Sequence, residues 1–202
     1  MGKGEQTRQL IVDRALTMAQ RIGLEQVTLG VLADELDLSK SGLFAHFKSK
    51  EQLQLEVVAE AVARFTSTVI LPALKAPRGL PRVQQLFEGY LRWIDSASGS
   101  SAHTGGCILM AFSYEYDDRP GPVHDAIQKA MQDWLDCIAR VAKTAVDAGE
   151  LAAGLDVKQF AFEFDGLLMA FHHAFKLHRN PRAEPMARKA LAHLLERSTP
   201  TR

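Results

Sequence analysis

The chain has 202 residues, and its 24 Lys and Arg side chains balance 24 Asp and Glu side chains. A formal net charge of zero excludes a protein that binds polyanions through a large uniform positive charge, and 47% hydrophobic residues exclude a disordered chain. Two cysteines, Cys107 and Cys137, are too few for a disulfide scaffold, so we expect free thiols. We find no signal-peptide pattern and no apolar run of the roughly 20 residues that a membrane span needs. We therefore expect a cytoplasmic protein without a membrane partner.

Apolar residues recur at positions i, i+3 and i+4, and no stretch alternates with the two-residue period of a strand. The eight prolines divide the chain into helical segments, because proline inside a helix costs about 3 kcal/mol. The pattern predicts an all-α fold of about nine helices, over residues 5–22, 28–35, 39–47, 49–71, 80–96, 106–116, 122–148, 156–177 and 185–197. Residues 96–104 are predicted to form a loop, and Ser49 with Gln52 fits a capping box.

Two short predicted helices joined by a tight turn lie near the N-terminus. Thr28 is placed to cap the first, LGVLADEL, and Ser39 to cap the second, KSGLFAHF, with Asp37 in the turn between them. The stretch from residue 38 to 50 has no acidic residue and carries the basic residues Lys40, His46, Lys48 and Lys50. This arrangement is typical of a helix-turn-helix, whose second helix enters the major groove of DNA. On pattern alone, a plain helical hairpin explains it equally well.

The segment from Arg8 to Glu56 resembles the N-terminal domain of the TetR (tetracycline-repressor-like) family of transcriptional regulators. The resemblance rests on Ala15–Leu29, which ends in GLEQVTL, and on VLADELDLSKSGLFAHFKSKEQL from Val31 to Leu53. It implies a three-helix DNA-binding domain with a helix-turn-helix over residues 1–50, and a helical bundle for effector binding and dimerisation over residues 51–202. It also implies a ligand-responsive repressor that binds a palindromic double-stranded DNA operator as a homodimer. The later residues resemble the family in architecture, with a weak likeness of residues 105–118 to one subgroup.

The resemblance implies a set of DNA-binding residues: Thr28, Ser39, Lys40, Ser41, Gly42, Leu43, Phe44, His46, Lys48 and Lys50. Small polar residues at the start of the second helix let the backbone approach base edges, and Lys40 is placed to reach a phosphate or a guanine. The basic residues after it are expected to contact phosphates, which fixes register without reading sequence. Simpler interpretations stay open: the hydroxyls as helix caps, the basic residues as a solvated face, and Leu43 as part of the small core.

Two positions depart from the family pattern. Asp37 stands where the family usually has glycine, and the turn tolerates it because aspartate adopts the left-handed conformation. Phe44 stands where the family commonly has a tyrosine that bonds a phosphate. Without the hydroxyl, we expect Phe44 to serve packing alone.

The last two predicted helices are rich in apolar residues on more than one face, as expected of helices that meet both a core and a partner subunit. The resemblance makes them half of a four-helix dimer interface, with Phe164, Phe171, Phe175, Met186, Leu191, Leu194 and Leu195. An apolar pocket for a small-molecule effector is predicted from Tyr90, Trp93, Met110, Phe112, Tyr116, Trp134, Phe162, Met169 and His173. Ordinary core packing is the simpler interpretation of these nine residues.

A catalytic or metal site finds little support in the sequence. His172 and His173 point about 100° apart on a helix, which suits one ion poorly, and no HExxH or CxxC pattern is present. We therefore expect no enzyme activity, no metal and no cofactor. The alternative to a DNA-binding regulator is a helical protein-interaction module without DNA binding.

Overall fold

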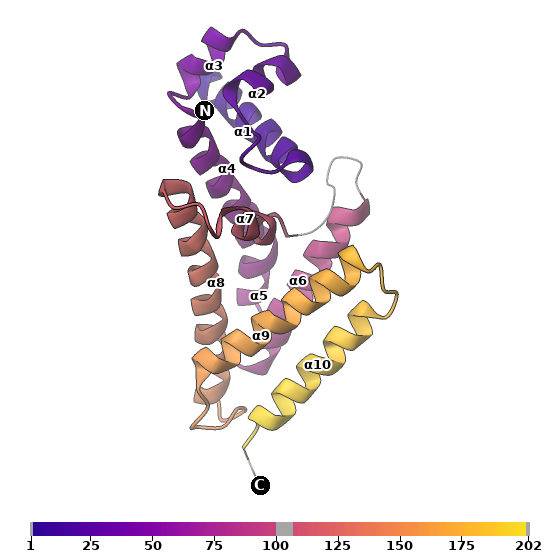
Figure 1. Ribbon diagram of the computed structural model, residues 1–202. Coiled ribbons are helices and arrows are strands. Elements are labelled where there is room, and N and C mark those ends of the chain that lie inside the picture. Colours follow the sequence, from indigo (N-terminus) through magenta and orange to yellow (C-terminus); the bar gives the residue numbers. More distant parts are fainter. Residues whose placement is uncertain (1, 100–106, 201–202) are drawn as a thin grey trace. The chain divides into compact units, whose positions relative to one another are not determined.

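Every regular element among residues 2–99 and 107–200, the part of the chain that the computed structural model describes, is a helix (Figure 1). In chain order these are α1 (Lys3–Ile22), α2 (Leu29–Leu36), α3 (Lys40–His46), α4 (Lys50–Phe65), the π-helical η1 (Thr66–Ile70), α5 (Leu71–Leu74), α6 (Leu80–Gly99), α7 (Ile108–Tyr116), α8 (Pro122–Asp147), α9 (Val157–His172), the π-helical η2 (His173–Leu177) and α10 (Ala183–Ser198). The prediction of an all-α fold is confirmed.

The two largest departures from the predicted helix ends are at the end of α6 and after Pro72. Helix α6 runs to Gly99, so the prediction of a loop from residue 96 is wrong for 96–99, and the rest of that predicted loop lies outside the described residues. Pro72 does not end the helical path that begins at Lys50. The π-turn η1 shifts the hydrogen-bond register so that the Leu71 N–H donates to the Thr66 carbonyl, five residues back. Such π-bulges let a helix continue past a position where the ordinary bond pattern fails.

The described residues divide into two compact units. The first unit contains the chain up to Arg64 together with Ile108–Met131, and the second contains Phe65–Gly99, Cys107 and the chain from Gln132 onward. In the first unit, Leu24, Leu32, Leu43 and Phe47 are completely buried. These side chains form the core against which α2 and α3 pack.

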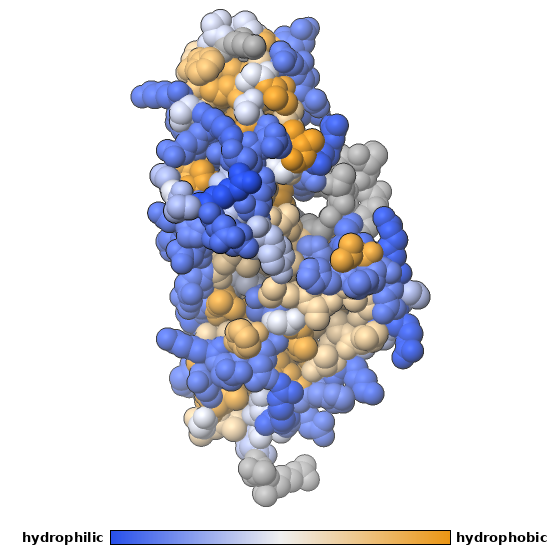
Figure 2. Space-filling model, viewed as in Figure 1, coloured by the Kyte–Doolittle hydropathy of each residue, from blue (hydrophilic) through white to orange (hydrophobic). Residues whose placement is uncertain are grey.

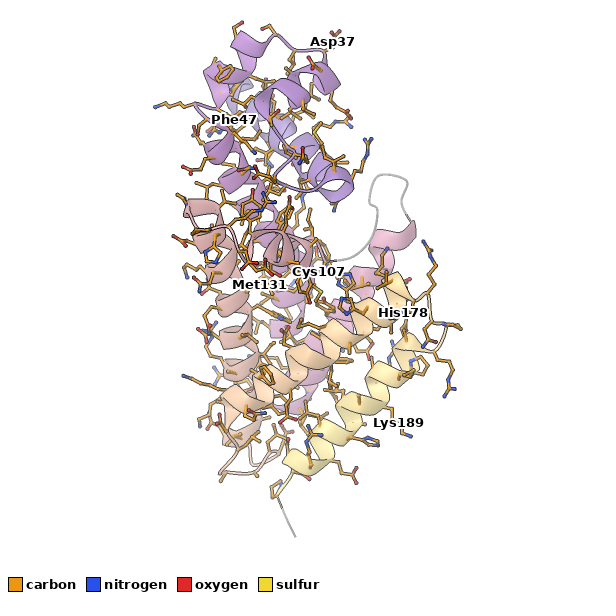
Figure 3. The ribbon with its side chains drawn as sticks, viewed as in Figure 1. Asp37, Phe47, Cys107, Met131, His178 and Lys189 are labelled. Carbon is orange, nitrogen blue, oxygen red and sulfur yellow. The ribbon has the colours of Figure 1, made fainter. Side chains whose placement is uncertain are left out.

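The turn between α2 and α3 adopts the conformation expected from the sequence. Asp37 ends α2 with φ 52° and ψ 40°, in the left-handed region, and its N–H donates to the Ala33 carbonyl (Figure 3). The start of α4 fits half of the predicted capping box, because the Ser49 hydroxyl accepts from the Gln52 N–H at 3.1 Å. The Gln52 side chain accepts instead from the Lys48 N–H at 3.0 Å, which extends the cap one residue further out.

In the second unit, α9 lies between its neighbours α6 and α10. The rings of Phe87 and Phe164 meet edge to face with centroids 5.4 Å apart, and Phe160 lies 6.1 Å from Phe164. All three side chains are less than 2% exposed, so the aromatic face of α9 forms the centre of this core. Burial of each such side chain stabilises the fold by about 1.5–3 kcal/mol.

The continuous helical stretch Lys50–Leu74 is long and apolar enough to cross a membrane by length and composition, with a mean hydropathy of 1.5 over 18 residues. A core helix of a globular protein meets the same criterion. Leu53, Val57 and Val69 on this stretch are completely buried by the protein itself. Across the apolar 18-residue window, 33% is buried inside the protein.

Candidate functional site

The two hydroxyls that flank α2 and α3 both cap helices. Thr28 Oγ1 accepts from the Val31 N–H at 3.2 Å, and Ser39 Oγ accepts from the Gly42 N–H at 3.1 Å. A methyl group added at Gly42 would lie 3.1 Å from Ser39 Oγ, so a larger residue there would crowd the cap. The caps fix the start of each helix, and the helix-turn-helix geometry therefore follows from local sequence.

The outer face of α3 presents small, polar and aromatic groups. Ser39, Ser41, Gly42 and Lys48 are exposed, and Phe44 is 55% exposed. The Phe44 ring is thus not part of the buried core, and its role at the DNA stays a prediction. Leu43 is completely buried, so its side chain belongs to the core of the first unit and is not available to DNA.

Arg8, on α1, holds the end of α3 and was not predicted as a site residue. Its guanidinium lies 4.5 Å from the centroid of the Phe47 ring, donates to the His46 carbonyl and forms an ion pair with Glu56. The partners are 38 and 48 residues away in the sequence, so no local pattern points to them. A cation on an aromatic face with two further bonds fixes where α3 ends.

Glu25, in the loop between α1 and α2, is the centre of a polar cluster. Lys50 Nζ lies 2.5 Å from its carboxylate, the Tyr116 hydroxyl donates to it at 2.9 Å, and Arg119 lies 3.8 Å away. The hydrogen bond from Lys50 is the largest of the effects that lower the pKa of Glu25 below its usual 4.5. Lys50 therefore already has an acidic partner within the protein, and its phosphate contact stays a prediction.

The same loop is held by a second carboxylate, from the end of α7. Glu115 accepts hydrogen bonds from the backbone N–H groups of Leu24 and Glu25, both at 2.8 Å. Gly23 makes this approach possible, since it has φ 86° and a Cβ there would lie 2.8 Å from a Glu115 oxygen. We call Glu115 and Tyr116 the α7 clamp, because the two residues fasten the end of α7 to the loop that leads into α2.

The nine predicted effector residues divide between the two units. Met110, Phe112 and Tyr116 belong to the first unit, where Tyr116 serves the α7 clamp. In the second unit Tyr90, Trp93 and Trp134 surround Phe65, which was not predicted. Phe162 is 70% exposed and His173 is also exposed, so neither lines a buried pocket as predicted. Met169 is half-buried.

Two families of known proteins match this chain. Residues 11–57 match "Bacterial regulatory proteins, tetR family", and residues 79–191 match "Tetracyclin repressor-like, C-terminal domain". The chain belongs to the TetR family of DNA-binding transcriptional regulators. The capped helix-turn-helix of α2 and α3 is therefore its DNA-binding element.

Individual proteins that resemble this TetR-family regulator are transcriptional regulators too. It is 27% identical over 169 residues to the HTH-type transcriptional regulator SrpR of Pseudomonas putida, covering 82% of this chain and 73% of SrpR. A TetR-family regulator from Cytophaga hutchinsonii has a similar structure, with a TM-score of 0.84, 19% identity and coverage of 100% and 99% of the two chains. AibR, solved in complex with isovaleryl coenzyme A and operator DNA, gives a TM-score of 0.72 at 18% identity over 93% and 97%.

The second unit of this TetR-family regulator contains a cavity of about 410 Å³ that was not predicted. Its lining mixes apolar and charged side chains, from Ile70, Leu74, Arg82, Asp133, Cys137, Arg140, Val141 and Thr144. None of the predicted effector residues lines it. The pKa of the Cys137 thiol is raised by burial, so the thiol is held in its neutral form.

The residues predicted for the dimer interface of the regulator are mostly interior. Four of them are at most 6% exposed within one chain, namely Phe164, Phe171, Leu191 and Leu194. The prediction is wrong for these four, because their faces of α9 and α10 form the core of their own unit. Phe175 and Leu195 are half-buried. The large apolar side chains that stand out from these helices are Phe162, Leu177 and Met186, at 70%, 73% and 53% exposure.

Proposed function

We propose that this regulator represses its target genes as a homodimer on a palindromic operator and leaves the operator when a small-molecule effector binds. The observation that carries the proposal is the outer face of α3, where exposed Ser39, Ser41 and Gly42 lie within the acid-free stretch that ends at Lys50. Small side chains let the backbone of α3 approach the base edges in the major groove, and the basic residues that follow are placed to contact the phosphate backbone. We assign the DNA-binding domain to residues 1–50 and the effector and dimerisation domain to residues 51–202.

The proposed dimer forms through the outward face of α9 and α10. Phe162, Gly166, Ala170, His173 and Leu177 follow one another at steps of three or four residues and are all exposed, so they share one face of the helical path. Figure 2 shows hydrophobic side chains gathered over α9 and α10, with hydrophilic side chains around them. A contiguous exposed apolar patch of this kind marks an interaction surface.

Dimerisation supplies the DNA affinity that one recognition helix lacks. The seven-residue α3 reads only a few base pairs, and two copies on half-sites one or more helical turns apart give the affinity of a specific regulator. The complex of AibR with an acyl coenzyme A and operator DNA is an example of this fold that holds both kinds of ligand. We place the action of the regulator in the cytoplasm, where DNA and small metabolites are both accessible, and assign it no catalytic role.

The proposal is tested by footprinting and gel-shift titration on DNA that flanks the regulator's own gene. We expect a protected, roughly palindromic site, and an affinity that falls steeply with salt because phosphate contacts release counterions. Light scattering of the purified protein should give the mass of a dimer. A protein that stays monomeric, or that does not prefer flanking DNA to competitor DNA, would be a helical interaction module instead.

A further inference from the structure

We infer that the effector is an organic cation, held by the aromatic cluster of the second unit with Asp165 as its counter-charge. The aromatic cluster consists of Phe65, Tyr90, Trp93 and Trp134. This inference rests on the proposed function, since it names the chemical class of the effector.

The aromatic cluster draws its rings from three helices. The Phe65 ring stands edge-on to the rings of Tyr90, Trp93 and Trp134, with centroids 6.2, 6.0 and 5.0 Å away. Tyr90 and Trp134 stack at 6.4 Å with an angle of 23° between their planes. Phe65, Tyr90 and Trp134 are at most 6% exposed. Each ring has a negative face, so a group that inserts among them is favoured if it carries positive charge.

A carboxylate lies at the edge of the aromatic cluster. The indole N–H of Trp134 donates to Asp165 Oδ1 at 2.8 Å. No Lys, Arg or His of the described residues forms an ion pair with Asp165 in this structure. Burial raises the pKa of Asp165 above its usual 3.8, since the charged form has lost solvent and gained only a neutral donor. Asp165 is half-buried, and a partly desolvated carboxylate without a counter-charge is costly to the fold and is relieved by an incoming cation.

The neighbouring histidine does not supply the missing charge. His172 is seven residues from Asp165 along the helical path and therefore lies on the same face. Its Nδ1 is buried and has no hydrogen-bond partner among the described residues. Burial lowers the pKa of His172 below its usual 6.5, so the ring is neutral at neutral pH. On this side α9 thus presents the Asp165 carboxylate and the neutral ring of His172, whose pKa is lowered further by the neighbouring charges of His173 and Lys176.

This combination selects between ligand classes. An anion would meet Asp165 and the negative ring faces, and a neutral ligand would gain apolar contact but leave the carboxylate uncompensated. An ammonium with apolar substituents gains both the cation–π attraction and the ion pair, each stronger because the site is shielded from water. Several ring faces and one acid suit a quaternary or tertiary ammonium better than a small hydrated ion.

The experiment uses three probes of similar size: phenyltrimethylammonium, its neutral isostere tert-butylbenzene, and benzoate. The chain has two tryptophans, and both belong to the aromatic cluster, so tryptophan emission reports binding directly. We expect the cation to quench emission and to lower operator affinity in a gel shift, and the neutral and anionic probes to do so at concentrations about tenfold higher or not at all. Asp165→Asn should weaken the cation about tenfold and leave tert-butylbenzene unchanged. The matched control Asp147→Asn, at an exposed position of the same unit, should bind the cation as the parent does.

Each outcome decides the inference. Equal cation affinity in the parent and in Asp165→Asn would overturn it, as would a preference for benzoate or no cation binding at millimolar concentration. Should the parent protein shift operator DNA and yet ignore the cation, the effector class is wrong while the proposed function stands. If it shifts no DNA at all, the proposed function itself fails.

Discussion

Replacing Glu115 by glutamine tests whether the α7 clamp holds the loop that leads into α2. The carboxylate accepts from two backbone N–H groups, of Leu24 and Glu25. A glutamine at this position keeps one acceptor oxygen and turns an NH₂ group toward the other N–H. The substitution therefore removes one charge-assisted hydrogen bond and adds a donor facing a donor.

The size of the effect follows from that geometry. A hydrogen bond to a charged group contributes about 1.5–3 kcal/mol, and we expect the lower end, about 1.5 kcal/mol, because Glu115 is only half-buried. For a chain of this length, such a loss lowers Tm by about 3–6 °C. Gly23→Ala should be destabilising as well, since its Cβ would occupy the space of a Glu115 oxygen and its φ of 86° is unfavourable for alanine.

The assay is thermal and urea unfolding followed by far-ultraviolet circular dichroism. Glu35→Gln is the control, because Glu35 forms only an exposed ion pair with Arg21 at 3.7 Å, and its loss should cost less than about 0.5 kcal/mol. The double variant of Gly23 and Glu115 should be less destabilised than the two single variants added together, since both act on one contact. If Glu115→Gln unfolds like Glu35→Gln, the clamp contributes nothing to stability, and an additive double variant would show that Gly23 and Glu115 do not act on one contact.

Three further predictions follow from exposure and charge. Lys48→Ala should weaken operator binding and reduce the slope of log affinity against log salt concentration by about one. Lys50→Ala should change this slope less, because Glu25 already neutralises the charge of Lys50. Equal slopes for the two variants would contradict this prediction. Phe162→Glu should yield a folded monomer by light scattering, while Phe164→Ala should cost about 3–5 kcal/mol of stability; a dimeric Phe162→Glu protein would refute the proposed face. Asp165→Asn should raise Tm by about 2 °C at pH 7. Because the pKa of Asp165 is raised above its usual 3.8, ionisation of this carboxyl destabilises the fold at higher pH. The gain in Tm from Asp165→Asn should therefore vanish below that pH. An unchanged or lower Tm of the variant at pH 7 would contradict this prediction.

Much of the DNA-binding element could be predicted because its determinants are local. Thr28 and Ser39 cap helices that begin one residue later, and Asp37 takes the left-handed turn. A cap, its partner N–H and the turn lie within four residues of one another, so the sequence holds the complete interaction. The exposed side of Phe44 and the buried side of Leu43 follow from the same helix once its phase is known.

The contacts that join distant segments could not be predicted. Glu115 and Leu24 are 91 residues apart, and Arg8 and Glu56 are 48 apart. A lone glutamate or arginine on a helix has many solvated alternatives, so its partner is decided only when the tertiary structure forms. The aromatic cluster is predicted only in part for the same reason. The residue types of Tyr90, Trp93 and Trp134 indicate a pocket, but their rings meet around Phe65, which lies at the end of a different helix.

The proposed dimer face shows why apolar content alone is a poor guide to an interface. Helix α9 is apolar nearly all round, and the phenylalanines at 160, 164 and 171 face its own core. The large apolar residue of α9 that remains for a partner is Phe162, whose aromatic ring predicts a place in the effector pocket when only the sequence is considered. An all-round apolar helix indicates that two faces are buried in the assembly, and only the structure tells which side belongs to which.

Trp93 and Trp134 are the two tryptophans of the chain, and both lie in the second unit. Tryptophan fluorescence therefore reports on the second unit alone. Tryptophan emission follows the unfolding of the second unit, while circular dichroism follows the helices of both. Coincident transitions would mean that the chain melts as one cooperative block, and separated transitions that the first unit opens independently. A substitution in the α7 clamp would then shift the dichroism curve and leave the emission curve in place. The placement of two indoles thus makes the natural sequence a ready two-probe system for measuring cooperativity between its two compact units.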